Sequence, residues 1–191
     1  DLSGSYTTTE IVEAGYTATE LKDTFTPTDL SGSYTTTEIA SAGYTVTELA
    51  DASFNATDLK TTFTPSDLSG SFTTTEIVQA GYTPTELKDT YTPTDLSGSF
   101  TTTEIASAGY TVTELADASF NATDLTSTFT PSDLSGSFTT TEIVQAGYTP
   151  TELKTTYSPA DLSGSFTTTE ILQAGYTVQE LIDSSFNTTD L

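Results

Sequence analysis

Hydrophobic residues follow one fixed order along the whole chain. An aromatic residue is followed four positions later by Asp or Glu and five positions later by Leu or Ile, as in Tyr6, Glu10 and Ile11. All twenty aromatic residues, ten Tyr and ten Phe, begin such a segment, and successive aromatics lie nine or ten residues apart. The chain is therefore a tandem array of short repeats, each contributing one aromatic and one aliphatic side chain.

A longer period is superimposed on the short repeats. The aromatic spacings run 10-9-9-10-10-9-9 and then begin again, so that seven short repeats form one super-repeat. The segment "DLSGS" accordingly recurs in matching context at Asp1, Asp67 and Asp133. We expect one continuous array over residues 1–191, made of super-repeats 1–66, 67–132 and 133–191. This array is expected to be a segment of a longer chain or a subunit that stacks on its neighbours.

Each short repeat carries the signals that start an α-helix. In the first repeat, Thr7 is a good N-cap, and Glu10 three residues later completes a capping box. Tyr6 and Ile11 on either side have the spacing of a hydrophobic staple. The first helical position, where a missing N–H is harmless, holds every proline: Pro27, Pro65, Pro84, Pro93, Pro131, Pro150 and Pro159.

The end of the first repeat carries a helix stop signal. Gly15 is expected to take the left-handed conformation that commonly follows a helix C-cap, with Tyr16 supplying the apolar contact beyond it. The pattern thus predicts twenty helices of one to two turns with almost no linkers. Because one repeat cannot bury its apolar face alone, we expect an all-α solenoid in which neighbouring repeats share a thin core.

A β-helix is the alternative fold. In stretches such as "DASFNATDLK", aromatic and aliphatic positions alternate every five residues. This spacing resembles that of pentapeptide-repeat proteins, a resemblance that implies a square right-handed β-helix. Four-residue steps, such as Leu21 to Phe25, interrupt the spacing, and a β-helix gives no reason for proline to keep one position. The helical solenoid is therefore favoured.

Charge and composition exclude several functions. Four basic residues stand against 27 acidic ones, for a net charge of −23, which disfavours binding to nucleic acids or anionic membranes. The chain has no Cys or His, so thiolate metal sites and the usual nucleophilic triads are excluded. There is no glycine-rich phosphate loop and no apolar run of bilayer length. We expect a protein that is not an enzyme, holds no organic cofactor and does not insert into membranes.

Two kinds of residue are candidates for binding or modification. The repeat carboxylates, beginning with Glu10, Glu20 and Asp29, could bridge calcium ions between adjacent turns, although helix capping explains each of them individually. Asn-x-Thr sequons recur once in each super-repeat and would be glycosylation sites in an exported protein: Asn55, Asn121 and Asn187. Asn is also an excellent N-cap, which is the simpler interpretation. Surplus Thr residues would be sites for O-linked glycans.

These features predict an extracellular or cell-surface structural protein, such as a fibre, filament, stalk or adhesin segment. Chains would associate end to end, and divalent cations or glycans would modulate contacts between them. One alternative is an acidic binding module, such as a DNA mimic of the pentapeptide-repeat type. Another is a designed repeat scaffold without a native function.

Overall fold

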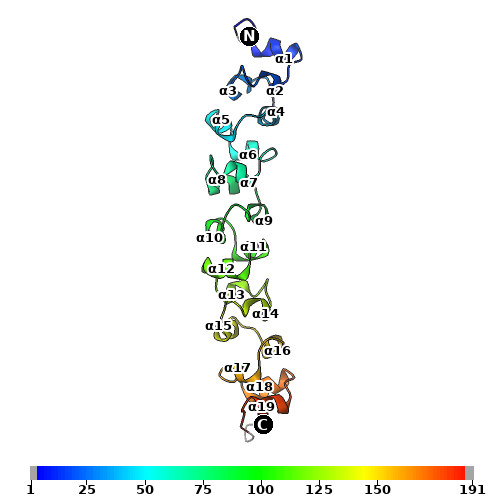
Figure 1. Ribbon diagram of the computed structural model, residues 1–191, viewed down its shortest axis with the longest axis vertical. Helices are drawn as coiled ribbons and strands as arrows, with labels where there is room; N and C mark the ends of the chain where they lie inside the picture. The colour runs from blue at the N-terminus through cyan, green and yellow to red at the C-terminus, as the bar shows by residue number, and fades with distance from the viewer. Residues whose placement is uncertain (1–3, 188–191) are drawn as a thin grey trace. The chain divides into compact units, whose positions relative to one another are not determined.

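The computed structural model describes residues 4–187, and over this range the chain is helical with no strand. Residues 4–187 contain nineteen short helices connected by a few residues each (Figure 1). The all-α tandem repeat predicted from the sequence is confirmed, and the pentapeptide-like β-helix is wrong, because each acid and aliphatic pair between residues 4 and 187 lies inside a capped helical turn. The twentieth predicted helix would begin after Asn187 and lies outside the described residues.

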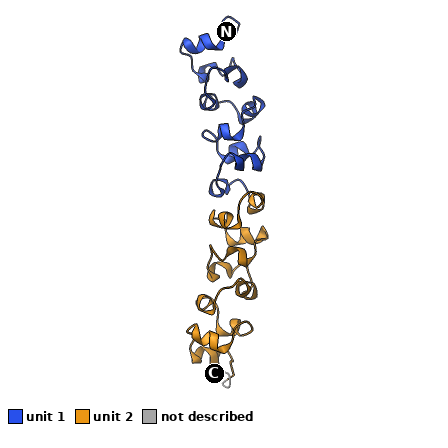
Figure 2. Cartoon of the chain, turned by 180° about the vertical axis from the view of Figure 1, so that it is seen from behind, with its two compact units in different colours: residues 1–91 blue, residues 92–191 orange. Residues whose placement is uncertain are grey.

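The chain divides into two compact units, residues 1–91 and residues 92–191 (Figure 2). The first unit contains α1 (Thr8–Glu13), α2 (Ala18–Leu21), α3 (Pro27–Leu30), α4 (Thr36–Ser41), α5 (Val46–Asp51), α6 (Ala56–Leu59), α7 (Pro65–Leu68), α8 (Thr74–Gln79) and α9 (Pro84–Leu87). The second unit contains α10 (Pro93–Leu96), α11 (Thr102–Ser107), α12 (Val112–Asp117), α13 (Ala122–Leu125), α14 (Pro131–Leu134), α15 (Thr140–Gln145), α16 (Pro150–Leu153), α17 (Pro159–Leu162), α18 (Thr168–Gln173) and α19 (Val178–Asp183). The boundary between the two units does not coincide with a boundary between predicted super-repeats. The single continuous array over residues 1–191 stays a prediction.

Every described helix begins with the predicted capping pair. In α1 the Thr7 amide donates to Glu10 Oε2 at 2.8 Å, and the Glu10 amide donates to Thr7 Oγ1 at 3.3 Å. The same carboxylate-to-cap bond recurs in all nineteen helices, with Asn or Ser replacing Thr in three of them. Ser158 is the exception in one respect: its hydroxyl donates to Asp161 at 2.6 Å, but the Asp161 amide bonds to the Ser158 carbonyl. The prolines occupy the first helical position, as predicted.

Repeat length determines how each helix ends. Ten-residue repeats form six-residue helices, and nine-residue repeats form four-residue helices. In the ten-residue repeat of α1, Gly15 is left-handed with φ of 92°, its amide bonds to the Val12 carbonyl, and the Tyr16 amide bonds to the Ile11 carbonyl. This is the Schellman motif that the sequence predicted. In the nine-residue repeat of α2, the Leu21 carbonyl instead accepts from both Thr24 and Phe25.

Serine replaces glycine as the left-handed residue in three ten-residue repeats, which the sequence analysis missed. Ser53, Ser119 and Ser185 have φ of 66° to 69°, whereas the six left-handed glycines have φ of 90° to 101°. The left-handed region open to L-residues is small and has its centre at a φ of about 60°. Serine is therefore tolerated where the backbone stays near that centre, and glycine is needed where φ lies beyond it.

The core contains the Leu or Ile of each repeat, which is at most 3% exposed in all nineteen described helices, together with buried Ala, Tyr and Phe side chains. No polar or charged residue is buried among the residues that the structure describes. Helices pack mainly on their second neighbours: α2 on α4, α4 on α6 and α6 on α8 in the first unit. The second unit repeats this pattern, with α11 on α13, α13 on α15, α14 on α16, α16 on α18 and α17 on α19.

Aromatic side chains are buried to different degrees, according to the residue before them. The buried aromatics all directly follow a left-handed Gly or Ser: Tyr44, Phe54, Tyr82, Tyr110, Phe120, Tyr148 and Tyr176. Those in the interior that follow a nine-residue repeat are half-buried. In the interior of the array the ring after a left-handed residue is thus buried, whereas Tyr16, which follows Gly15 near the N-terminal end, is 43% exposed.

Candidate functional sites

The candidate calcium ligands lie at separate helix N-termini. Glu10, Glu20 and Asp29 each accept the amide and the hydroxyl of their own N-cap Thr, at 2.6–2.8 Å. For Glu10 and Glu20, the backbone hydrogen bond and then the hydroxyl bond lower the carboxyl pKa; for Asp29 the order of the two causes is reversed. Over residues 4–187, no group of three or more acidic residues is arranged to hold a metal ion. The geometry explains these carboxylates as caps, and calcium bridging stays a prediction.

The sequon residues Asn55 and Asn121 are N-caps of α6 and α13. Asn55 Oδ1 accepts the Asp58 amide at 3.0 Å, while the Asn55 amide donates to Asp58 Oδ2 at 2.9 Å. Asn121 makes the same two bonds with Asp124 at the same distances. Both side chains are exposed. Asn187 is also exposed, but the rest of its sequon lies outside the described residues.

Each of these two N-cap asparagines lies at the edge of an open cleft. In the first unit the cleft has a volume of about 460 Å³ and extends from Asn55 and Thr57 to Glu76 and Gln79 of α8. In the second unit the equivalent cleft is about 340 Å³ and extends from Asn121 and Thr123 to Glu142 and Gln145 of α15. The four-residue helix α6 packs on the six-residue helix α8 beside the first cleft, and α13 packs on α15 in the same way beside the second.

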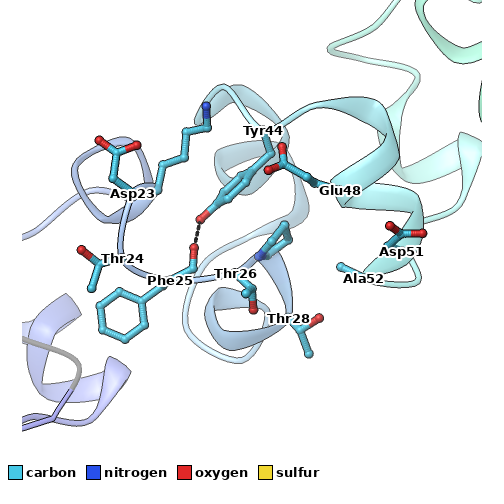
Figure 3. Close-up of a pocket in the computed structure, with 11 residues that line it drawn as sticks. Asp23, Thr24, Phe25, Thr26, Thr28, Tyr44, Glu48, Asp51 and Ala52 are labelled. Atoms are coloured by element: carbon cyan, nitrogen blue, oxygen red, sulfur yellow. Dashed lines mark hydrogen bonds between the residues drawn. The ribbon is translucent and has the colours of Figure 1, made fainter.

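A second kind of cleft contains lysine and aromatic residues. One of about 440 Å³ is lined by Lys22, Phe25, Pro27, Tyr44 and Glu48, together with other residues of α3, α5 and the connections beside them (Figure 3). In Figure 3 the Tyr44 hydroxyl points to the Phe25 carbonyl, to which it donates a hydrogen bond of 2.6 Å.

An equivalent cleft of about 490 Å³ lies further along the chain, with Lys60, Phe63, Pro65, Tyr82 and Glu86 at matching positions. Both clefts belong to the first unit, and both combine aromatic faces with carboxylates and a single lysine.

Three of the four lysines lie over the ring of the tyrosine that begins the third repeat after their own. The Nζ atoms of Lys22, Lys60 and Lys154 are 4.9–5.9 Å from the ring centres of their partner tyrosines. Lys60 and Lys154 also donate to the carbonyls of the left-handed glycines Gly81 and Gly175. A cation at a helix C-terminus interacts favourably with the helix dipole. Sequence reasoning missed this contact, and the only signal for it is that each lysine directly follows the Leu of a nine-residue repeat.

Tyrosine hydroxyls provide a second link between repeats. Tyr82, Tyr148 and Tyr176 donate to the carbonyl of the aromatic residue 19 positions earlier, at 2.6–2.7 Å. Burial first, and nearby carboxylates second, raise the pKa of these phenols. The Tyr148 and Tyr176 bonds join the repeats of α14 and α16 and of α17 and α19, whose helices also pack on each other, and all three bonds satisfy carbonyls at the start of a repeat. Their role is therefore structural.

Comparison of the chain with protein-family models, with curated proteins and with solved structures gives no match. In the described part of the chain, none of the helices has the length and hydrophobicity needed to span a bilayer. The interpretation of function therefore depends on the geometry of the repeats themselves.

Proposed function

We propose that this chain is a non-enzymatic structural protein whose repeats continue as a solenoid, in an extracellular fibre, filament, stalk or adhesin. The supporting observation is the second-neighbour packing of nearly identical repeats, with one buried Leu or Ile in each. A repeat of this kind needs contacts only from nearby repeats, so the array can be lengthened by copying without a new core. Its acidic side chains lie outside the core and would keep neighbouring chains apart.

End-to-end association is the second part of the proposal. Large apolar side chains are exposed near both ends of the described chain: Tyr6 and Tyr16 are 56% and 43% exposed, and Val178 and Ile182 are 51% and 44% exposed. Tyr82, which matches Tyr16 one super-repeat later, is only 4% exposed because preceding repeats cover it. We propose that the α18–α19 end of one chain packs against the α1–α2 end of another and continues the second-neighbour contacts.

Small-angle X-ray scattering and sedimentation of the 191-residue chain test both parts. An extended monomer at low concentration, with longer particles at higher concentration, is the expected result, and electron microscopy should show filaments. Val178→Glu should abolish the lengthening, whereas Thr103→Glu, which adds the same charge at an exposed position of α11, should not. A compact monomer would contradict the solenoid, and an extended particle of constant length would contradict end-to-end association.

The DNA-mimic alternative was based on a β-helix, which the structure does not have over the described residues, so its geometric support is lost. No described cleft favours a particular small molecule over the structural role.

A further inference from the structure

We propose that Asn55 and Asn121 are acceptors for N-linked glycans and that the folded repeat carries the glycan without losing its helix cap. This inference depends on the extracellular location in the proposed function, but not on filament formation. Asn-x-Thr is the acceptor sequence for this modification, and the middle residues, Ala56 and Ala122, are not proline.

The two ends of the asparagine amide have separate roles. Asn55 Oδ1 accepts the Asp58 amide and so provides the cap, while its Nδ2 takes part in no hydrogen bond of the described structure. Asn121 is arranged in the same way with Asp124. A glycan is attached through Nδ2 and leaves the amide oxygen in place as an acceptor. The cap and the modification are therefore chemically compatible.

The Thr caps of neighbouring helices do not have this division of roles. Thr45, which caps α5, uses its single hydroxyl oxygen both to accept the Glu48 amide at 3.2 Å and to donate to the carboxylate at 2.8 Å. Any group attached to that oxygen would remove the donor. Asparagine is thus the cap in this array that can carry a substituent while its capping oxygen still accepts the helix amide.

The surroundings of Asn55 have room for a sugar. Asn55 and Thr57 are exposed at the edge of the cleft of about 460 Å³ that leads to Glu76 and Gln79. Amide and carboxylate groups on the far side can hydrogen-bond sugar hydroxyls. Asn121 has the equivalent surroundings, with Glu142 and Gln145.

The reaction is transfer of a glycosyl group from a lipid-linked diphosphate donor by an oligosaccharyltransferase. A bond forms between Asn Nδ2 and the anomeric carbon of the sugar, while the bond from that carbon to the diphosphate oxygen breaks. The diphosphate leaves with the electron pair, and the amide proton passes to a base of the transferase. No electrons are gained or lost overall, and the chain supplies only the acceptor nitrogen.

The test is to express the full chain behind a secretion signal in a eukaryotic host and to map glycans by peptide mass spectrometry. We expect occupancy at both Asn55 and Asn121. Thr57→Ala, which keeps the Asn55 cap, should remove one glycan, and Thr57→Ser should restore it. Asn55→Thr should also remove one glycan while it retains a cap of the kind found in the other repeats.

The folded state is checked after endoglycosidase treatment that leaves one sugar on each asparagine. The melting temperature should be no lower than that of the Thr57→Ala, Thr123→Ala double variant, which carries no sugar at either site. Secreted chain with unmodified asparagines would overturn the proposal, as would a glycosylated chain that melts at a lower temperature than this variant. Filament formation is measured separately on chain made without glycans in bacteria, so failure of one proposal does not imply failure of the other.

Discussion

Gly147→Ala should destabilise the second compact unit through the backbone alone. Gly147 has φ of 101°, and a Cβ added to it would meet no atom within 4 Å. Steric contact with neighbouring side chains therefore cannot account for any loss. An L-residue in the left-handed conformation costs about 1–2 kcal/mol, and φ of Gly147 lies beyond the centre of that region. We expect a loss of at least about 1–2 kcal/mol in local unfolding free energy.

Gly136→Ala is the matched control in the same unit. A Cβ at Gly136 also meets no atom within 4 Å, but its φ lies outside the left-handed range. Removing a glycine where alanine fits stabilises a protein by about 0.4–1 kcal/mol, because the unfolded chain has fewer conformations. The two Gly→Ala changes should therefore alter stability in opposite directions, although both add one methyl group that meets no atom within 4 Å.

Native-state hydrogen exchange is the suitable assay because it measures local opening in an array that need not unfold in one step. The amide of residue 147 bonds to the Val144 carbonyl at 3.1 Å, and a loss of about 1–2 kcal/mol would speed its exchange roughly 5- to 30-fold. Gly136→Ala should leave this rate unchanged or lower it. If both variants exchange alike, the link between repeat length and left-handed geometry is refuted.

Four further outcomes are expected. Leu153→Ala should cost about 2–5 kcal/mol in urea unfolding, because Leu153 is 0% exposed and leaves a cavity. Thr149→Ala should cost about 1 kcal/mol in the same assay by removing the cap of α16; Thr155→Ala, at an exposed position, should not. Tyr148→Phe should cost about 1 kcal/mol, since the Phe129 carbonyl loses its donor; an unchanged midpoint would contradict the hydroxyl link. Far-UV circular dichroism should show helix loss as pH falls below about 4. Folding lowers the pKa of capping acids such as Glu152, so these acids stabilise the folded state fully at pH values above their pKa in the unfolded chain. This stabilisation is lost as the pH falls through their pKa in the folded chain.

The sequence predicted the helix starts because they depend on local chemistry. The Thr7 and Glu10 spacing, the position of Pro27 and the left-handed Gly15 all act within one or two turns, and the structure confirms each of them. Ser53 was missed because serine does not favour positive φ. Only its place at the end of a ten-residue repeat, where six other repeats have Gly, could have revealed it.

Contacts between repeats were not predictable in the same way. Periodicity shows that Leu59 and Tyr82 are apolar positions, but it does not say that helices pack on second neighbours rather than on adjacent ones. The position of Lys60 over Tyr82 follows from that packing and was likewise missed. For the candidate sites, the sequence located the sequon asparagines, whereas the clefts beside them depend on which helices meet.

Second-neighbour packing also has a consequence for how the chain is made. The tyrosine hydroxyl bonds join residues only 18 to 22 positions apart. Ribosomes add about 5–20 residues per second, so a helix would wait roughly one to four seconds for the partner that completes its contacts. Contacts of such short range also favour rapid folding. Each new helix would thus make its contacts during translation. Only the last few repeats to be synthesised would be unfolded and accessible to proteases at any moment.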